Sequence, residues 1–175
     1  HSASGAQVTE AVASARKAQA DWARRPQHDR TIILETYAEE LKKRADAIAD
    51  AISRDMGKIG WDARAEAGAM AGKVAISIKA QVERAGTSFS EAAIGSMHLT
   101  HRPHGVMAVF GPFNFPGHLP NGHIVPALLA GNTCVLKPSE LAPSVAHIMI
   151  EAFEAAGLPA SVLNIVQGGR DTGAA

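Results

Sequence analysis

An uninterrupted apolar run at residues 106–110 constrains the fold more than any other feature of the sequence. Gly111 and Pro112 follow it directly and end it. A short run that is apolar at every position is typical of a parallel strand buried on both faces. Parallel strands need long crossover connections, which are usually helices, so the run predicts a layered α/β fold.

The residues that follow supply those connections. Helical spacing predicts a short helix at 124–129 and a second one at 144–156, while apolar runs predict strands at 133–136 and 162–166. With the first strand, this order is β-α-β-α-β. Pro126 lies inside the first helix, so it either kinks that helix or marks its true start.

The first half of the chain is predicted to be helical. Apolar positions at helical spacing indicate three amphipathic helices, over residues 8–22, 29–57 and 61–82. Pro26 ends the first, Asp29 is a candidate N-cap for the second, Gly57 stops the second, and Gly86 closes the third.

Three segments follow from these patterns. Residues 1–85 form a helical segment, residues 86–104 form a linker with a weak edge strand, and residues 105–175 form the β-α-β-α-β unit. The edge strand rests on Met97, Leu99 and His101, which alternate along the chain.

Composition excludes several functional classes. Lys and Arg together number 17, as do Asp and Glu, so no overall field attracts nucleic acid or an anionic membrane surface. The single cysteine excludes an internal disulfide framework, and no apolar run approaches the roughly 20 residues that span a bilayer. We therefore expect a cytoplasmic protein. We also expect a piece of a longer chain, because residues 1–5 lack an initiator Met and residues 171–175 read as the opening of a helix.

Three chemically unusual loops follow the predicted strands, at residues 111–116, 137–140 and 167–173. Open parallel sheets bind ligands beyond the carboxyl ends of their strands. Because all three loops belong to that one edge, we expect a ligand site there.

The first loop holds Asn114 between prolines and glycines that restrict the backbone. An amide N–H held at a strand end can donate to an oxyanion that forms at a substrate carbonyl, and losing one such donor typically costs about 3 kcal/mol of barrier. The alternative is that Asn114 only closes a turn, and from this residue alone that alternative is favoured.

The other two loops carry features of dinucleotide sites. Lys137 can hold ribose hydroxyls, and Glu140 can accept from a ribose 2′-OH while repelling a 2′-phosphate, which favours NAD over NADP. Alternatively, this is a solvated loop whose glutamate caps the next helix. Gly168 and Gly169 let the backbone approach a pyrophosphate at a helix start, although any βα turn can be rich in glycine.

Two further candidates are set aside. Cys134 lies inside a buried strand with no base beside it in sequence, so we expect a small core residue and not a nucleophile. His118 and His123 have no Cys or acidic ligand near them in sequence, so no metal site is predicted. His118 is instead a candidate for the lining of a substrate approach.

Three motifs occur in the order and spacing of the aldehyde dehydrogenase superfamily. They are Gly111-Pro112-Phe113-Asn114-Phe115-Pro116, then Gly131-Asn132 leading into Lys137-Pro138-Ser139-Glu140, then Asn164-Ile165-Val166 leading into Gly168-Gly169. The chain resembles that superfamily over nearly its whole length. Within it, residues 114–126 most resemble the dehydrogenases that act on N-succinylglutamate 5-semialdehyde in bacterial arginine catabolism.

The resemblance implies a Rossmann-like parallel sheet, the N-terminal part of the aldehyde dehydrogenase fold, preceded by a helical segment. It implies oxidation of a small-molecule aldehyde with NAD, by a protein that is a homo-oligomer when full length. It also implies a set of site residues: Asn114 as the oxyanion donor, Lys137 and Glu140 at the adenosine ribose, Ser139 as a further cofactor-binding residue, Gly168 and Gly169 at the pyrophosphate, and Phe110, Gly111, Pro112 and Phe113 along the nicotinamide.

By the same resemblance, the nucleophilic cysteine and the general-base glutamate come after residue 175, so we expect the chain alone to be inactive. The adjacent Gly168-Gly169 departs from the family, many of whose members separate these glycines by one residue. Two alternatives remain open: a family member with a different aldehyde substrate, and a non-catalytic module that binds nucleotide or assembles with other chains.

Overall fold

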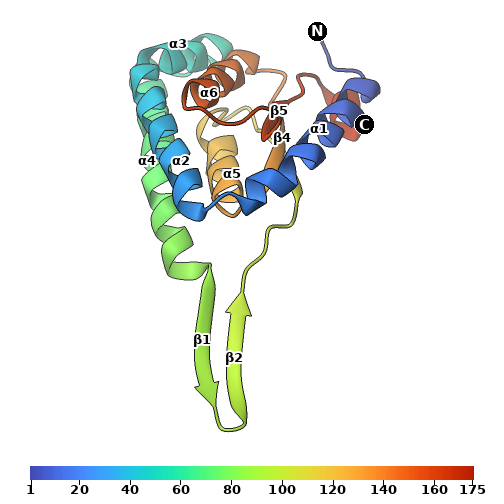
Figure 1. Cartoon of the computed structure of the whole chain (residues 1–175). Coiled ribbons are helices and arrows are strands. Elements are labelled where there is room, and N and C mark those ends of the chain that lie inside the picture. Colours follow the sequence, from blue (N-terminus) through green and yellow to red (C-terminus); the bar gives the residue numbers. More distant parts are fainter.

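A computed structural model describes the whole chain, residues 1–175. The order along the chain is α1 (Gly5–Arg24), α2 (Gln27–Lys43), α3 (Ala45–Met56), α4 (Gly60–Arg84), β1 (Thr87–Ala92), β2 (Gly95–Thr100), β3 (Val106–Phe110), α5 (His118–Leu129), β4 (Thr133–Lys137), α6 (Pro143–Ala155), β5 (Leu163–Ile165) and α7 (Arg170–Ala174). Figure 1 shows a body of helices around a small sheet, with the β1–β2 hairpin extending away from it. None of the helices combines the length and apolar character that crossing a membrane requires.

The sheet confirms the predicted α/β class. β3, β4 and β5 are parallel and lie in that order, so β4 is the central strand. Its residues alternate between two cores. Cys134 and Leu136 face the large core that α5 and the helices beyond it supply, whereas Val135 faces a smaller cluster with Ala15 of α1. The Thr133 hydroxyl donates to the Ala15 carbonyl at 3.0 Å on that same face.

The prediction that the first strand is buried on both faces is wrong. In β3 only Val109 is buried, and Phe110 at the carboxyl end is 60% exposed. β3 pairs only with β4, so it is an edge strand, and Val106 and Met107 are only partly buried against the two cores. An apolar run therefore identified the strand but not its place in the sheet.

Two helix predictions also need correction. The long helix predicted over residues 29–57 is two helices, α2 and α3, divided at Arg44 (φ −101°, ψ 7°). The Arg44 guanidinium donates to the carbonyl and to the carboxylate of Glu40, which satisfies acceptors at the end of α2. Asp29 is not the N-cap, because α2 begins at Gln27 and Asp29 lies within its first turn. Gly57, with φ +66°, does stop α3 as predicted.

The helix predicted at 124–129 begins six residues earlier, at His118. Pro126 therefore lies inside α5 and does not mark its start. The earlier start depends on Glu66 of α4, whose carboxylate accepts the first backbone N–H groups of α5.

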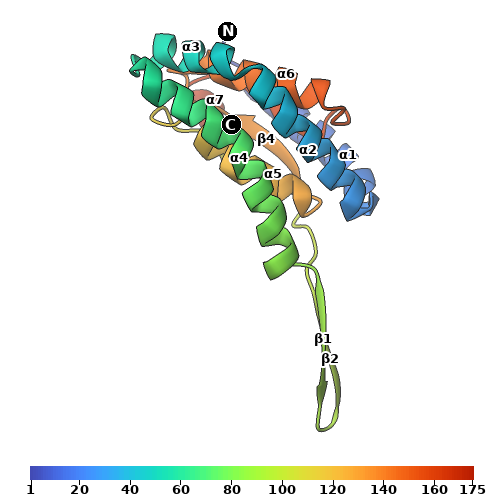
Figure 2. The ribbon, with the colours of Figure 1, turned by 90° about the vertical axis from the view of Figure 1, so that its left-hand side faces the viewer.

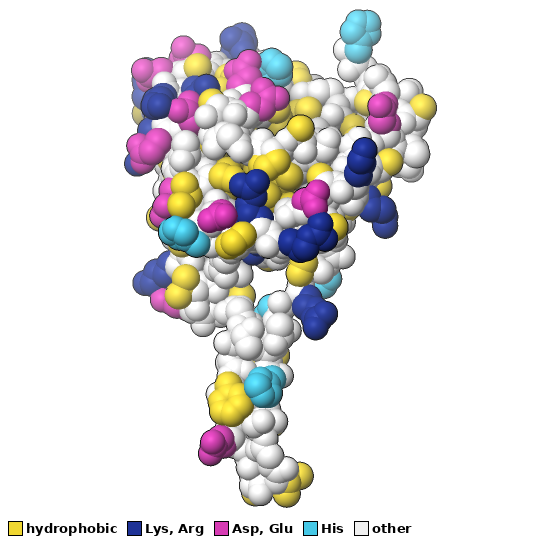
Figure 3. All heavy atoms as spheres, in the orientation of Figure 1, with side chains coloured by type: hydrophobic (Ala, Val, Ile, Leu, Met, Phe, Trp, Pro, Cys, Tyr) yellow, Lys and Arg dark blue, Asp and Glu magenta, His cyan; other side chains and the backbone are white.

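Residues 86–104 contain a hairpin and not a single edge strand. β1 and β2 pair antiparallel from Thr87 opposite Thr100 to Ala92 opposite Gly95. Both strands are exposed along their whole length. The space-filling view in Figure 3 shows the hairpin standing clear of the body, with apolar side chains at its tip and along its length.

Buried polar side chains join the N-terminal helices to α5. Arg30 of α2 donates to the carbonyls of Trp22 and Ala23 in α1 and of Leu129 in α5. These carbonyls lie at the C-terminal ends of their helices, where a cationic donor is favourable. The Tyr37 hydroxyl donates to Asn121 Oδ1 at 2.9 Å, and the Asn121 amide donates to a carbonyl of α4. In Figure 2, α2 and α4 lie along α5 with the hairpin below them.

Tyr37→Phe should destabilise the fold by about 1–3 kcal/mol, because it leaves the buried Asn121 Oδ1 without a donor. The ring stack of Tyr37 on Phe153, with centroids 3.5 Å apart, is retained in the variant. Denaturant unfolding of the chain measures the loss. Thr36→Ala is the control, since its exposed hydroxyl bonds only its own helix. Equal stabilities for both variants would show that the Tyr37–Asn121 bond contributes nothing.

Candidate functional site

The three loops predicted to share one sheet edge are joined by hydrogen bonds. The Gly111 N–H donates to the Lys137 carbonyl at 2.9 Å, which ties the first loop to the second. Lys137 Nζ donates to the Gly168 carbonyl at 2.6 Å, which ties the second loop to the third. The carboxyl ends of β3, β4 and β5 therefore form one continuous surface.

Asn114 is exposed on this surface. It lies in a bend between Pro112 and the buried Pro116, and its side chain makes no hydrogen bond to the rest of the chain. An amide without an internal partner is available to a ligand. Two other side chains of this edge, those of Phe110 and Phe113, are more than half exposed beside it.

Lys137 and Glu140 form an ion pair of 3.2 Å at the end of β4. The Lys137 side chain is largely buried, whereas that of Glu140 is 55% exposed. The backbone N–H of Glu140 and the Lys137 ammonium lower the pKa of the Glu140 carboxyl below its usual range. The carboxylate is therefore charged at neutral pH and faces solvent at the site.

The hydrogen-bonding capacity of Lys137 is only partly used. Of its three N–H groups, Glu140 and the Gly168 carbonyl take two, so one remains for a ligand. Ser139 is buried instead, and its hydroxyl accepts from the Leu141 N–H at 3.2 Å. This hydrogen bond closes a turn within the loop.

Gly168 and Gly169 differ in what surrounds them. A Cβ on Gly168, which has φ +154°, would lie 2.0 Å from Thr172 Oγ1, so only glycine fits there. A Cβ on Gly169 would meet only Glu140 Oε1 at 3.9 Å. Gly169 is therefore the position where a ligand can approach the backbone, while Gly168 is needed for packing against α7.

Sequence patterns did not identify Glu66 and Lys58, which lie beneath the Asn114 loop. Glu66 Oε1 accepts from the N–H groups of Gly117 and His118 at 3.0 and 3.1 Å, and its other oxygen pairs with Lys58 at 2.7 Å. The sequence did contain a signal for Glu66, because this residue falls on the buried stripe of α4 that includes Ala63 and Met70. A carboxylate on an apolar stripe needs a partner.

Cys134 has no base or cation to activate it. Its side chain is fully buried in the large core, and burial raises the pKa of the thiol from 9.0 to about 12. His118 Nδ1 is buried without a hydrogen-bond partner, while His123 is exposed. No three His, Cys, Asp or Glu side chains are gathered so that they could hold a metal ion.

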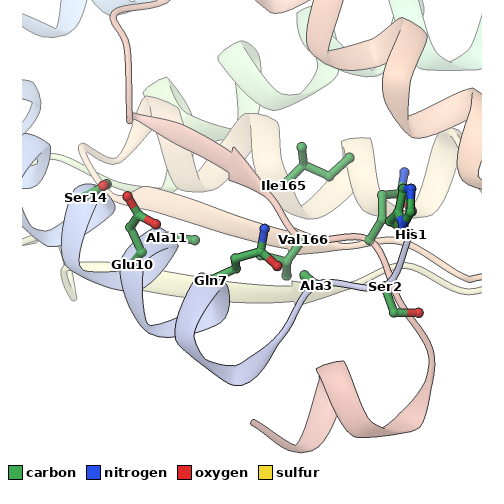
Figure 4. Close-up of a pocket in the computed structure, with 10 residues that line it drawn as sticks. His1, Ser2, Ala3, Gln7, Glu10, Ala11, Ser14, Ile165 and Val166 are labelled. Atoms are coloured by element: carbon green, nitrogen blue, oxygen red, sulfur yellow. The ribbon is translucent and has the colours of Figure 1, made fainter.

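Two hollows of the surface border the third strand-end loop. One of about 310 Å³ is lined by Gly169, Arg170, Asp171 and Thr172 of that loop and by residues 2–5. A groove of about 350 Å³ runs between α1 and the open edge of β5, lined by Gln7, Glu10 and Ala11 on one side and Ile165 and Val166 on the other (Figure 4). It shares only Gln167 with the third loop and contains no cationic side chain of Lys or Arg. The polar groups that can do chemistry are at the carboxyl ends of the strands.

Comparison with known proteins identifies the class. The aldehyde dehydrogenase family matches residues 1–175. The chain therefore belongs to the aldehyde dehydrogenase family. An aldehyde dehydrogenase structure from Brucella melitensis superposes with a TM-score of 0.93 at 31% identity, covering 99% of this chain and 36% of that one. The NADP-dependent glyceraldehyde-3-phosphate dehydrogenase of Bacillus halodurans, complexed with NADP, superposes with a TM-score of 0.89 at 29% identity, covering 95% and 36%.

Closer relatives share a more specific name. The chain is 59% identical over 174 residues to the N-succinylglutamate 5-semialdehyde dehydrogenase of Burkholderia ambifaria. It is 57% identical over 173 residues to N-succinylglutamate 5-semialdehyde dehydrogenase 2 of Caulobacter vibrioides. In both cases the match covers 99% of this chain, which spans only 36% of the relative's length.

Cys134 should be almost unreactive in the folded chain. With a pKa near 12, the thiolate fraction at pH 8 is about a thousandfold lower than with a pKa near 9. Reaction with a chromogenic disulfide at pH 8 should therefore be slow in buffer and fast in denaturant, with Cys134→Ser as the blank. Rapid labelling of the folded chain would contradict the core assignment.

The same pKa predicts how stability depends on pH. The thiol has a higher pKa in the folded state, so its contribution is fully present below about pH 9 and is lost as the pH rises toward 12. In Cys134→Ala, the free energy of unfolding should no longer show this fall between about pH 9 and 12.

Proposed function

We propose that this chain forms the cofactor-binding and oxyanion-binding part of an enzyme that oxidises N-succinylglutamate 5-semialdehyde with NAD. The observation that supports it most is the joining of three strand-end loops that present a free amide, an ion pair and an open glycine on one surface. Identities of 57–59% to enzymes named for that substrate support the choice of aldehyde.

The residues at this edge fit a dinucleotide. The Glu140 carboxylate is an exposed acceptor suited to a ribose hydroxyl, and Lys137 has one N–H to donate to the same sugar. Gly169 leaves room for a pyrophosphate beside its backbone. The exposed Phe110 and Phe113 supply flat apolar surface toward the nicotinamide end. When bound, NAD accepts a hydride in such a reaction.

Asn114 contributes electrostatic stabilisation. As a nucleophile adds to an aldehyde, negative charge develops on the carbonyl oxygen, and an N–H donor held in place stabilises that charge more than it stabilises the ground state. The prolines on either side of Asn114 limit the reorganisation that the donor needs. The nucleophile is not Cys134, whose thiol is buried, so we propose that the chain alone has no turnover.

The chain spans 36% of the length of these relatives, and we propose that the nucleophile and the general base belong to the rest of the complete enzyme. We propose that the complete enzyme, the polypeptide encoded by the whole reading frame to which the chain belongs, is a homo-oligomer. The exposed Phe89, Ile94, Met97 and Leu99 on the hairpin support this, because such apolar surface is usually covered. The single free cysteine suits a reducing compartment such as the cytoplasm.

In the complete enzyme, Asn114→Ala should slow the chemical step roughly a hundredfold to a thousandfold, as loss of one oxyanion donor does elsewhere. The exposed side chain makes no internal bond, so the thermal midpoint should stay within a few degrees. Single-turnover hydride transfer with N-succinylglutamate 5-semialdehyde, measured beside thermal unfolding, tests both. A variant that is unstable yet transfers hydride at the wild-type rate would show that Asn114 only closes a turn.

Glu140→Gln in the complete enzyme should reduce the preference for NAD over NADP, because it removes the charge that repels a 2′-phosphate. Steady-state kcat/KM for both cofactors measures the ratio. Glu151→Gln is the matched control, since that carboxylate is exposed on α6 and pairs only with His147. If the cofactor ratio is the same in wild type and Glu140→Gln, Glu140 is not at the cofactor.

A further inference from the structure

The Asn114 loop is held from below by a buried carboxylate. The Glu66 side chain has no exposed surface, and its Oε1 accepts from two consecutive N–H groups, those of Gly117 and His118. These are the first donors of α5, which have no partner within the helix. Asn114 lies three residues before the first of them, so Glu66 sets where the loop ends.

Lys58 neutralises this carboxylate and also contacts the loop itself. Its ammonium lies 2.7 Å from Glu66 Oε2 and 3.9 Å from the centroid of the Phe115 ring. Phe115 is the residue that follows Asn114. A cation at that distance from an aromatic face is attracted to it, so the ion pair restrains both ends of the segment from Phe115 to His118.

Close packing keeps α4 near enough for these contacts. A Cβ on Gly117 would lie 2.4 Å from Sδ of the buried Met70, one turn after Glu66 on α4, so a larger residue there would force the Met70 side chain to move. The Asn121 amide donates to the Met70 carbonyl at 2.9 Å, one turn further along α5. Together these contacts fix α4 against the start of α5.

We propose that Glu66, with its partner Lys58, is a positioning residue that aims the Asn114 amide at the aldehyde oxygen. The proposal rests on the oxyanion role proposed for Asn114. Glu66 contacts neither substrate nor cofactor in this arrangement. It acts through the backbone of residues 115–118, and its loss changes the orientation of Asn114 more than the binding of either ligand.

Glu66→Gln tests the proposal in the complete enzyme. Glutamine keeps the shape and one acceptor for Gly117 and His118, but it turns an NH₂ group toward the Lys58 ammonium. We expect kcat to fall roughly tenfold to a hundredfold, since a misplacement of about 1 Å can cost that much, while KM for the aldehyde and for NAD changes little. Asp62→Asn is the matched control, because Asp62 is more exposed, lies 3.9 Å from Lys58 and does not contact the loop. It should leave kcat unchanged.

Combination with Asn114→Ala separates positioning from general stability. If Glu66 acts through Asn114, the double variant should be no slower than Asn114→Ala alone. A further loss of rate in the double variant, or a wild-type kcat in Glu66→Gln, would overturn the proposal. A wild-type rate in Asn114→Ala alone would instead refute the oxyanion role, and the positioning role with it.

Lys58→Met supplies a second route if Glu66→Gln does not fold. It keeps the apolar stem and leaves the two backbone bonds to Glu66 in place, but it removes the charge over Phe115. We expect the same fall in kcat with little change in KM. In the Asn114→Ala background, Lys58→Met should cause no further fall in kcat. A wild-type kcat in folded Lys58→Met, or a loss of rate that adds to that of Asn114→Ala, would overturn the proposal by itself.

Discussion

The arrangement of this chain depends on carboxylates that satisfy the backbone N–H groups at the start of the helices after the strands. Such groups have no partner within their own helix. Glu66 of α4 accepts from the start of α5, and Asp55 of α3 accepts from the backbone and hydroxyl of Ser144 at the start of α6. Two helices that are distant in sequence from the sheet thus set where its connections begin. The helical layer and the sheet cannot shift independently.

The fixed helix starts also restrain the loops of the candidate site. Each strand-end loop is bounded by a strand on one side and by a helix start on the other, so fixing the helix starts fixes the loops. Lys137 adds a second restraint, because its ammonium joins the loops after β4 and β5 through Glu140 and the Gly168 carbonyl. These restraints come from contacts within the chain itself, and loops held in this way lose less conformational entropy when a ligand binds.

Local patterns predicted the parts of the fold that local chemistry decides. The strand predicted at 133–136, which the structure has at Thr133–Lys137, follows from a short apolar run, the stop at Gly57 from a glycine, and the shared edge of the three loops from the geometry of parallel sheets. The start of α5 could not be predicted in this way, because it depends on Glu66, which is 51 residues away from Gly117. The break at Arg44 depends on side-chain bonds to Glu40, with no glycine or proline to signal it. The exposure of β3 depends on what lies beside it, which its own residues do not encode.

The same contacts bear on the choice between the two interpretations of Asn114. An asparagine that closes a turn does so by bonding its own neighbouring backbone. Here the side chain of Asn114 makes no such bond, and the turn is held by flanking prolines and by Glu66. An exposed polar group that the fold does not use, placed where three strands end, is better explained by a ligand than by stability, and this favours the oxyanion role.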